Sequence, residues 1–309
     1  MKVVFMGTSD FAVPSLARLV EYNYSIAGVV TQPDRPRGRG KKISFSPVKE
    51  LSIKLGLEIF QPNRIGDSES TDVLRYWEPD VIVVVAYGQI LPAEVLDLPR
   101  LGCINVHGSL LPHYRGAAPI QRAIMAGDKV TGVTTMFMNT GLDTGDIILQ
   151  TPMEIGLEMD FGEVHDLLAR AGADLLLDTM AVLASGSNPR RKQDEHRISY
   201  APRLSREEER IDWHQDAITI KNHIRALSPQ PGAYTSLRGQ RFKIFRSQVL
   251  EPDIGSKAGE IVDITSEGFA VQTGNGVLEI LEVQKEGKKR ISSLDFMKGF
   301  GLEPGEILS

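Results

Sequence analysis

An asparagine and a histidine stand two residues apart at the end of a short run of small and apolar residues that begins at Cys103. The run predicts a buried strand over residues 103–107, which Gly108 and then Pro112 terminate. Alternate side chains of a strand share one face, so Asn105 and His107 project together. At the carboxyl end of a strand, where open α/β sheets bind ligands, such a pair is a candidate site.

An amide and an imidazole side by side offer hydrogen bonds to a ligand. Asn105 can donate from its amide, and a protonated His107 can donate from a ring nitrogen, to a negatively charged oxygen such as an oxyanion. The sequence contains no Gly-x-Ser-x-Gly nucleophile elbow. The alternative is a core histidine whose hydrogen bonds are satisfied and an asparagine that caps a loop.

A third candidate, Asp143, lies in the glycine-rich string Gly141-Leu142-Asp143-Thr144-Gly145, after an expected strand over residues 131–138. Strand ends at one edge of a sheet approach one another, so we expect Asp143 to pair with His107. The carboxylate would orient the imidazole and favour its charged form. The alternative is a turn residue between glycines, where aspartate is common.

Strands and helices alternate along the first 184 residues. We expect strands at 2–6, 26–31, 57–60, 81–85, 103–107, 131–138 and 147–155, and helices after residue 9, at 47–55 and 68–77, up to residue 126, and at 161–184. This order predicts an α/β fold with a Rossmann-like, doubly wound, mainly parallel sheet. Residues 7–12 lack the Gly-x-Gly-x-x-Gly fingerprint, which disfavours a nicotinamide site.

The stretch Ser185 to Pro189 marks a boundary, and residues 190–203 are polar without apolar periodicity. We therefore predict a catalytic domain at 1–188, a linker at 189–205 and a smaller domain at 206–309. In the last of these, a helix at 217–227 precedes five short strand-like segments, at 232–237, 241–250, 259–265, 268–273 and 277–283. That pattern favours a small β-barrel of the oligonucleotide-binding (OB) type.

Composition narrows the class of protein. The chain has 309 residues, of which 41% are hydrophobic and 24% charged, as is usual for a globular protein. Its longest apolar run, 81–87, is far short of the ~20 residues that span a bilayer. The single cysteine excludes an intrachain disulfide framework and a cysteine-based zinc site. We expect a cytoplasmic monomer with no metal and no membrane partner.

Basic residues gather in two places although the net charge is −5. The first is a long loop at 32–46, and the second is the acid-free stretch 221–250. The loop is either a solvated connection or an arm that orders on a phosphate backbone. The candidate nucleic-acid contacts are Arg35, Arg37, Arg39, Lys41 and Lys42 in the loop, and Arg241, Lys243 and Arg246 in the smaller domain.

Three strings together resemble the folate-dependent formyltransferases: Asn-x-His at 105–107, Ser-Leu-Leu-Pro at 109–112 and Gly-Leu-Asp-Thr-Gly-Asp-Ile at 141–147. The resemblance runs over essentially the whole chain. It implies that Asn105, His107 and Asp143 are catalytic, and that 10-formyltetrahydrofolate is the formyl donor and co-substrate. It also implies a folate pocket against Tyr87, Gly88, Gln89, Ile90, Leu91, Pro92, Ser109, Leu110, Leu111 and Pro112.

Within this family, the basic loop and a basic C-terminal domain point to one acceptor. They favour formylation of the α-amino group of initiator methionyl-tRNA, in translation initiation, and the family's loop at this position enters the acceptor stem. Relatives that formylate a purine-pathway ribonucleotide or a sugar nucleotide share the catalytic strings and stay as alternatives. A non-catalytic RNA-binding protein with a decayed formylase domain is a third.

Overall fold

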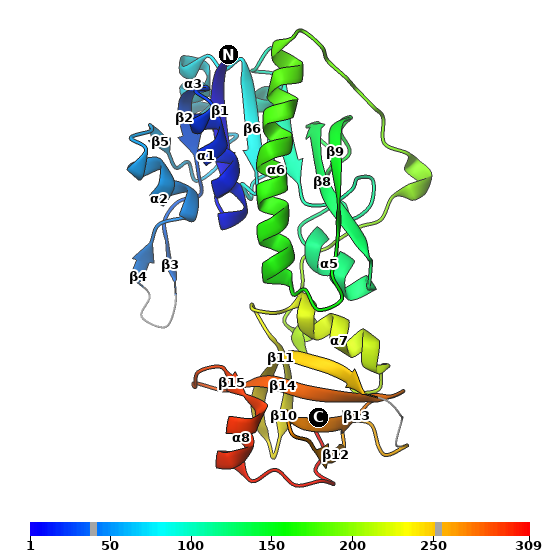
Figure 1. The fold of residues 1–309 in the computed structure, drawn as a ribbon. Coiled ribbons are helices and arrows are strands. Elements are labelled where there is room, and N and C mark those ends of the chain that lie inside the picture. Colours follow the sequence, from blue (N-terminus) through cyan, green and yellow to red (C-terminus); the bar gives the residue numbers. More distant parts are fainter. Residues whose placement is uncertain (38–41, 251–254) are drawn as a thin grey trace. The chain divides into compact units, whose positions relative to one another are not determined.

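The structure, a computed structural model, describes residues 1–37, 42–250 and 255–309 (Figure 1). The chain forms two compact units, each built from several segments. Unit 1 comprises Met1–Gly116, Val130–Glu154 and His165–Ala201, and unit 2 comprises Ala117–Lys129, Ile155–Val164 and Pro202–Ser309. The division expected from the sequence, at 188 and 205, stays a prediction.

A seven-stranded sheet forms the middle of unit 1, in the order β5-β2-β1-β6-β7-β8-β9. Its strands are β1 (Lys2–Gly7), β2 (Ser25–Val30), β5 (Ile59–Phe60), β6 (Val81–Val85), β7 (Cys103–His107), β8 (Val130–Phe137) and β9 (Ile147–Glu154). The pairs from β5 to β7 are parallel, whereas β8 and β9 run antiparallel to their neighbours. The predicted Rossmann-like, mainly parallel sheet is confirmed.

Helices cover both faces of this sheet. They are the 3-10 helix η1 (Asp10–Ala12), α1 (Val13–Glu21), α2 (Pro47–Lys54), α3 (Ser68–Trp77), α4 (Ala93–Leu96) and α6 (Phe161–Ala184). The 3-10 helix η2 (Glu195–Arg197) lies in the segment that follows α6. Figure 1 shows α1 and α6 in front of the sheet. On the other face, the Trp77 ring of α3 fills the space above Gly28 of β2, where a Cβ would lie 2.3 Å from the ring.

The expected basic loop contains a hairpin stem. Strands β3 (Arg35–Arg37) and β4 (Lys42–Ser44) pair antiparallel, with Arg35 opposite Ser44. The sequence predicts only a long loop at 32–46, and the paired strands correct that prediction. Pro36 has no N–H but its φ suits an extended chain, so a two-stranded ribbon can accept it. Two candidate cations, Arg39 and Lys41, lie outside the described residues.

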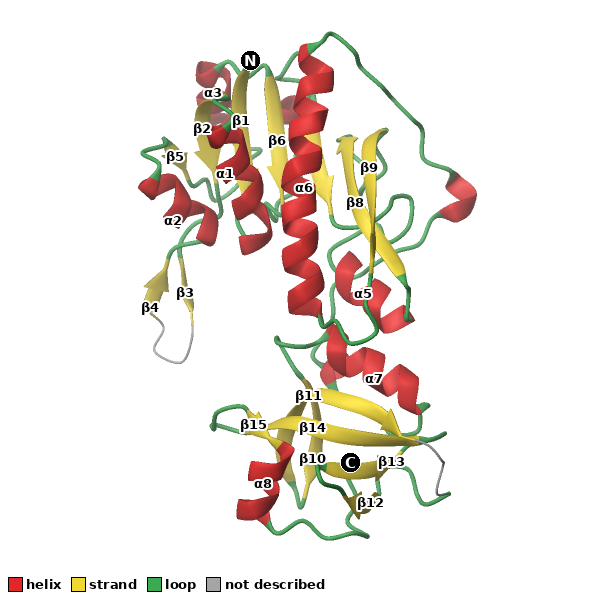
Figure 2. Cartoon of the chain, viewed as in Figure 1, coloured by secondary structure: helices red, strands yellow, loops and turns green. Residues whose placement is uncertain are grey.

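Unit 2 contains an antiparallel sheet in the order β10-β11-β14-β13-β12, with β15 beside β14 (Figure 2). Its elements are α5 (Pro119–Ala126), η3 (Glu207–Glu209), α7 (Ala217–Ala226), β10 (Ala233–Leu237), β11 (Gln240–Leu250), β12 (Ile261–Ile264), β13 (Phe269–Gln272), β14 (Val277–Lys285), β15 (Ile291–Ser292) and α8 (Ser293–Phe300). All five predicted segments form strands. The separate antiparallel domain is confirmed, and its closure into an OB-type barrel stays a prediction.

One observation bears on membranes and one on metals. No helix in the described ranges is long and apolar enough to cross a bilayer. Nor does any cluster of three or more His, Cys, Asp or Glu side chains in those ranges form a possible metal site.

Candidate active site

Strand β7 presents Asn105 and His107 on the face of the sheet that lies away from α6. The side chain between them, Val106, packs on α6, since a Cβ at Gly172 would lie only 2.9 Å from Val106 Cγ1. Two residues before Asn105 on the same face, Cys103 joins a buried apolar cluster. Burial raises the pKa of the Cys103 thiol to about 12, so this cysteine is a core residue and no nucleophile.

The imidazole of His107 lies between two acceptors. Its Nε2 is 3.0 Å from the carbonyl oxygen of Tyr114, and its Nδ1 is 3.7 Å from Oδ2 of Asp143. A carbonyl can only accept, so Nε2 carries a hydrogen. The neutral ring then turns an acceptor nitrogen toward Asp143, whereas the protonated ring can donate to both neighbours. The ring is therefore oriented by the Tyr114 carbonyl, with its other nitrogen turned toward Asp143.

Asp143 reaches His107 from a loop, residues 138–146, that folds back over the sheet. The backbone of Asp143 is left-handed, with φ of 51°, which aspartate tolerates better than most residues. Its Oδ2 accepts a hydrogen bond of 2.8 Å from the backbone N–H of Gly116. Within the loop, Oδ1 of Asn139 accepts from Gly141 N and Thr144 Oγ1. The Gly116 N–H thus holds the carboxylate, and the hydrogen bonds of Asn139 hold the loop that carries it.

The predicted pair is present, but the reason given for it was wrong. Because β7 and β8 are antiparallel, their carboxyl ends lie at opposite edges: His107 pairs with Thr134, and Phe137 pairs with Ile104. The loop therefore has to turn back to bring Asp143 to His107. Gly145 makes this return possible, because a Cβ there would lie 1.6 Å from the Phe137 carbonyl oxygen.

Asn105 is partly exposed, and within the described ranges no partner is found for its side-chain amide. Buried polar groups normally find partners, so a free amide beside a fixed imidazole is open to a substrate. This amide can donate to a carbonyl oxygen while His107 stays held by Tyr114 and Asp143. The structure thus brings together the three residues that the sequence singled out, and their role in acyl transfer stays a prediction.

The segment 87–92, expected to contact folate, begins right after β6. Tyr87 is buried, and its carbonyl oxygen accepts from Thr8 Oγ1 at 2.8 Å. The amide of Gln89 is used within the fold, since Oε1 accepts from Ile65 N at 2.8 Å. Ile90, in contrast, is 85% exposed although it is apolar. Leu91 is buried, and Gly88 has a φ of 91°, so the segment offers Ile90 and backbone to a ligand.

The turn 109–112 is held by two residues that the sequence analysis did not identify. Thr134 Oγ1 donates to the Ser109 carbonyl and accepts from Leu111 N. Gln150 Nε2 donates to the Leu111 carbonyl at 2.9 Å. Both come from the antiparallel strands β8 and β9, whose place in the sheet was not foreseen. Of the predicted folate residues here, Ser109, Leu111 and Pro112 are buried, and Leu110 is half-buried.

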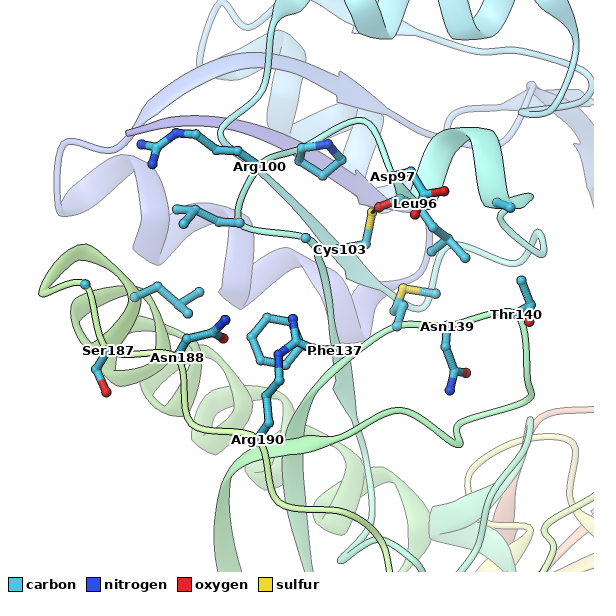
Figure 3. A pocket seen from close by; sticks show the side chains of 17 residues that line it. Leu96, Asp97, Arg100, Cys103, Phe137, Asn139, Thr140, Ser187, Asn188 and Arg190 are labelled. Atoms are coloured by element: carbon cyan, nitrogen blue, oxygen red, sulfur yellow. Dashed lines mark hydrogen bonds between the residues drawn. The ribbon is translucent and has the colours of Figure 1, made fainter.

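A pocket of about 800 Å³ lies in unit 1 around the amino end of β7, where Gly102 and Cys103 line it together with Phe137 and Met138 (Figure 3). It begins one residue after the predicted folate segment, at Ala93, and reaches Asn139 and Thr140 in the loop that carries Asp143. On its far side, the Arg190 guanidinium stacks on the Phe137 ring at 3.9 Å from the centroid. None of the ten predicted folate residues lines it. No motif in the sequence pointed to this pocket, because its walls come from separate segments.

The base of the basic hairpin is fixed by one carboxylate. Asp34 accepts from Lys49 Nζ at 2.5 Å and from Gln61 Nε2 at 3.0 Å. The Lys49 ammonium and the Gln61 amide together hold the pKa of Asp34 below its usual range. Arg35, the next residue, is exposed. Of the remaining loop cations, only the backbone of Arg37 and Lys42 is described.

The three candidate cations of unit 2 differ in how they are engaged. Arg241 stacks over the Tyr234 ring at 3.4 Å and pairs with Glu209 at 3.4 Å. Lys243 donates to the Pro231 carbonyl. Arg246 is exposed, and its guanidinium contacts no other group in the described part of the chain. Arg246 is thus the most available of the three.

Comparison with known sequences decides the family. Residues 1–180 match the family described as "Formyl transferase", and residues 203–301 match "Formyl transferase, C-terminal domain". The chain belongs to the formyl transferase family. The resemblance drawn from the three strings is therefore confirmed, and it extends across both units of this formyl transferase.

Individual relatives of this formyl transferase support the assignment. The methionyl-tRNA formyltransferase of Syntrophomonas wolfei subsp. wolfei is 50% identical over 309 residues, which is 100% of this chain and 98% of the relative.

Among solved structures, the sugar 3N-formyl transferase WlaRD matches with a TM-score of 0.69 and 22% identity, over 94% of this chain and 99% of that one. HypX from Aquifex aeolicus in complex with tetrahydrofolic acid matches with a TM-score of 0.67 and 18% identity. The match covers 97% of this chain but only 47% of HypX. At these identities the two structures show the fold alone.

Proposed function

We propose that this formyl transferase moves the formyl group of 10-formyltetrahydrofolate to the α-amino group of initiator methionyl-tRNA. The observation that carries the proposal is the 50% identity, over all 309 residues, with the methionyl-tRNA formyltransferase of S. wolfei. The match spans the whole chain, so it covers unit 2 as well as the unit that carries Asn105, His107 and Asp143.

The reaction is an attack by the methionyl amine on the formyl carbon, through a tetrahedral intermediate that carries an oxyanion. The free amide of Asn105 is the hydrogen-bond donor available to stabilise that charge. Both ring nitrogens of His107 face other groups, Tyr114 O and Asp143 Oδ2, so a protonated His107 would act on the oxyanion through its positive charge. Removal of one preorganised donor of this kind costs about 10²–10³ in rate, or ~3–4 kcal/mol. The imidazole is fixed before substrate arrives, because His107 is held by the Tyr114 carbonyl and lies beside Asp143.

We assign Asp143 to the proton transfers that accompany the reaction. The attacking amine must lose a proton as the new C–N bond forms, and the folate nitrogen must gain one as the old bond breaks. A carboxylate 3.7 Å from Nδ1 of His107 stabilises the imidazolium while charge develops nearby. With a side chain 14% exposed, Asp143 can also pass a proton through water.

We place formyl-folate against segment 87–92 and turn 109–112. The exposed Ile90 offers an apolar surface that a flat ring system can cover, and the backbone around Gly88 is open to a ligand. The turn 109–112 lies directly after the strand that carries the donors, so a ligand there brings its formyl group toward Asn105.

We place the tRNA on the cations of the hairpin and of β11. Arg35 and Arg246 are exposed and free of carboxylate partners in the described ranges, so they can bind phosphates. The remaining cations of the loop 32–46, which are Arg37, Arg39, Lys41 and Lys42, complete the proposed set together with Arg241 and Lys243 of unit 2. We expect the enzyme to act as a monomer in the cytoplasm, where its tRNA substrate is used.

A competition assay tests the acceptor. Labelled formyl-folate is offered with charged initiator tRNA, a purine-pathway aminoribonucleotide and an amino-sugar nucleotide in one reaction, with uncharged initiator tRNA as the control. The proposal predicts that label goes to the charged tRNA and requires its methionyl amine. Transfer to either small amine in preference to the tRNA would overturn it. Transfer to none of them would favour the non-catalytic alternative.

A further inference from the structure

The segment 190–201, which follows α6 and ends unit 1, packs along the candidate active site; we call it the strap. At its start, Arg191 and Ile147 exchange two backbone hydrogen bonds, of 2.8 and 3.0 Å. At its end, Arg115 N donates to Ser199 O and Ala201 N donates to Arg115 O. A polar segment without apolar periodicity is here bound to the sheet through its backbone.

One side chain of the strap, Gln193, makes four hydrogen bonds around Asp143. Its Nε2 donates to the carbonyl oxygens of Asp143 and Gly145, each at 2.8 Å. Its Oε1 accepts from Nε and Nη2 of Arg115 at 3.0 and 2.7 Å. An amide has two donor hydrogens and two acceptor lone pairs, so this one is fully used.

These bonds close a ring of contacts on the catalytic carboxylate. Arg115 is buried and is followed by Gly116, whose N–H donates to Oδ2 of Asp143. Gln193 joins the Arg115 side chain to the backbone of Asp143. The left-handed backbone of Asp143 is a conformation that persists only when its surroundings enforce it, and Gln193 supplies that enforcement.

The strap also fixes the other neighbour of His107. Ser199 Oγ accepts from the N–H of Tyr114 at 2.9 Å, and the Tyr114 carbonyl accepts from Nε2 of His107. Both groups that flank the imidazole are therefore held from one segment: Tyr114 through Ser199, and Asp143 through Gln193.

We propose that Gln193 is a positioning residue for formyl transfer, which holds Asp143 against His107 by anchoring its loop to Arg115. The proposal rests on the proposed function for its activity readout. It assigns to the strap a part in the reaction that its polar sequence does not reveal.

The test uses the full chain with two substitutions. Gln193→Met keeps the length of the side chain and removes all four hydrogen bonds. Gln193→Glu keeps the acceptors for Arg115 but cannot donate to the two carbonyls, and it places a negative charge beside them. Gln284→Met is the matched control, because Gln284 is a half-buried glutamine in β14 that donates to the Lys288 carbonyl, away from the strap.

We expect both Gln193 variants to lower kcat by up to ~10²-fold with an unchanged KM for formyl-folate, because misplacement by about 1 Å can have that effect. Gln284→Met should leave kcat unchanged. Should Gln193→Met fail to fold, Gln193→Glu carries the test, because its contact with Arg115 is retained.

A double-mutant cycle with Asp143→Asn separates positioning from a general structural role. If Gln193 acts through Asp143, Gln193→Met loses most of its effect on kcat in the Asp143→Asn background. Equal effects in both backgrounds, or wild-type kcat in both Gln193 variants, would overturn the proposal. The cycle is run with whichever acceptor the competition assay identifies, so a wrong acceptor would contradict the proposed function and leave the outcome for Gln193 readable.

A crystal structure of Gln193→Met gives a readout that needs no acceptor. We expect the Gly116–Asp143 hydrogen bond to be broken and Asp143 to have moved away from Nδ1 of His107. An unchanged loop in that variant would contradict the proposal even if all activity measurements failed.

Discussion

Nδ1 of His107 and Oδ2 of Asp143 lie 3.7 Å apart, although the strands that precede them end at opposite edges of the sheet. The nine residues 138–146 span this separation by crossing back over the sheet, between β8 and β9. The pairing therefore depends on the path of a loop, and the residues that shape this path are as necessary to it as the pair itself.

Gly145 is the residue whose substitution tests this path. In Gly145→Ala the new Cβ would meet the Phe137 carbonyl at 1.6 Å, so the loop must move. We expect a loss of about 1–3 kcal/mol in the free energy of unfolding, the usual cost of overpacking, together with a lower kcat. Urea unfolding and steady-state kinetics measure the two effects. Gly299→Ala on α8, where nothing lies within 4 Å, is the control and should be neutral or slightly stabilising. Wild-type behaviour of Gly145→Ala would contradict the account.

The stability of unit 2 should depend on pH through His223. Burial lowers the pKa of His223, whose Nε2 donates to the Glu208 carbonyl at 2.7 Å. The unfolded chain, with a pKa of about 6.5, takes up the proton first, so acidification favours unfolding. The stability that a neutral, buried His223 contributes is fully present above the pKa that this histidine has in the unfolded chain. It is lost as the pH falls through the lower pKa that His223 has in the folded chain.

His223→Gln should therefore flatten the fall in the free energy of unfolding between pH 8 and pH 5. The measurement is urea unfolding across that range, for the parent chain and the variant. His196→Gln, an exposed histidine of η2, should leave the pH dependence as it is. The idea fails if His223→Gln and the parent lose stability in parallel.

The cations of β11 should contribute unequally to tRNA binding. Arg246 is exposed, whereas Arg241 is already paired with Glu209 and stacked on Tyr234. Arg246→Ala should reduce the slope of log K against log salt by about 0.7–0.9, as expected for one lost phosphate contact. Arg241→Ala, the matched variant in the same strand, should change it less. The reverse order would show that the Glu209 pair opens when tRNA binds.

The hairpin should bind phosphate through Arg35 as well. We expect Arg35→Ala to reduce the salt slope of tRNA binding by about 0.7–0.9 and to leave formyl-folate binding unchanged. Arg75→Ala on α3 removes a cation that is already paired with Asp72, and serves as the control. Equal slopes for Arg35→Ala, Arg75→Ala and the parent would remove the hairpin from the tRNA contact.

Much of the fold was predictable because its signals are local. The β-branched run 81–85 is β6, the predicted helices 68–77 and 161–184 are α3 and α6 at the same residues, and the Asn-x-His strand is β7. Helix α8 was missed although a local signal existed: Ser292 caps it by accepting from Asp295 N, in a Ser-x-x-Asp pattern.

The rest depends on contacts between residues far apart in sequence. The hairpin stem follows Asp34, which is fixed by Gln61 from 27 residues away. Gln193 meets Asp143 and Arg115 across 50 and 78 residues. A polar stretch such as 190–203 has the same composition whether it is a solvated linker or a strap bound to a sheet, so no sequence pattern could separate the two.

The most direct test of the account is single-turnover formyl transfer to charged initiator tRNA by Asn105→Ala, His107→Ala and Asp143→Ala, with the affinity for formyl-folate measured alongside. The account predicts that each variant binds formyl-folate but transfers the formyl group at least ~10²-fold more slowly, and that double variants lose less than the product of the single effects. Near-normal transfer by any one of the three would contradict its assignment to the reaction.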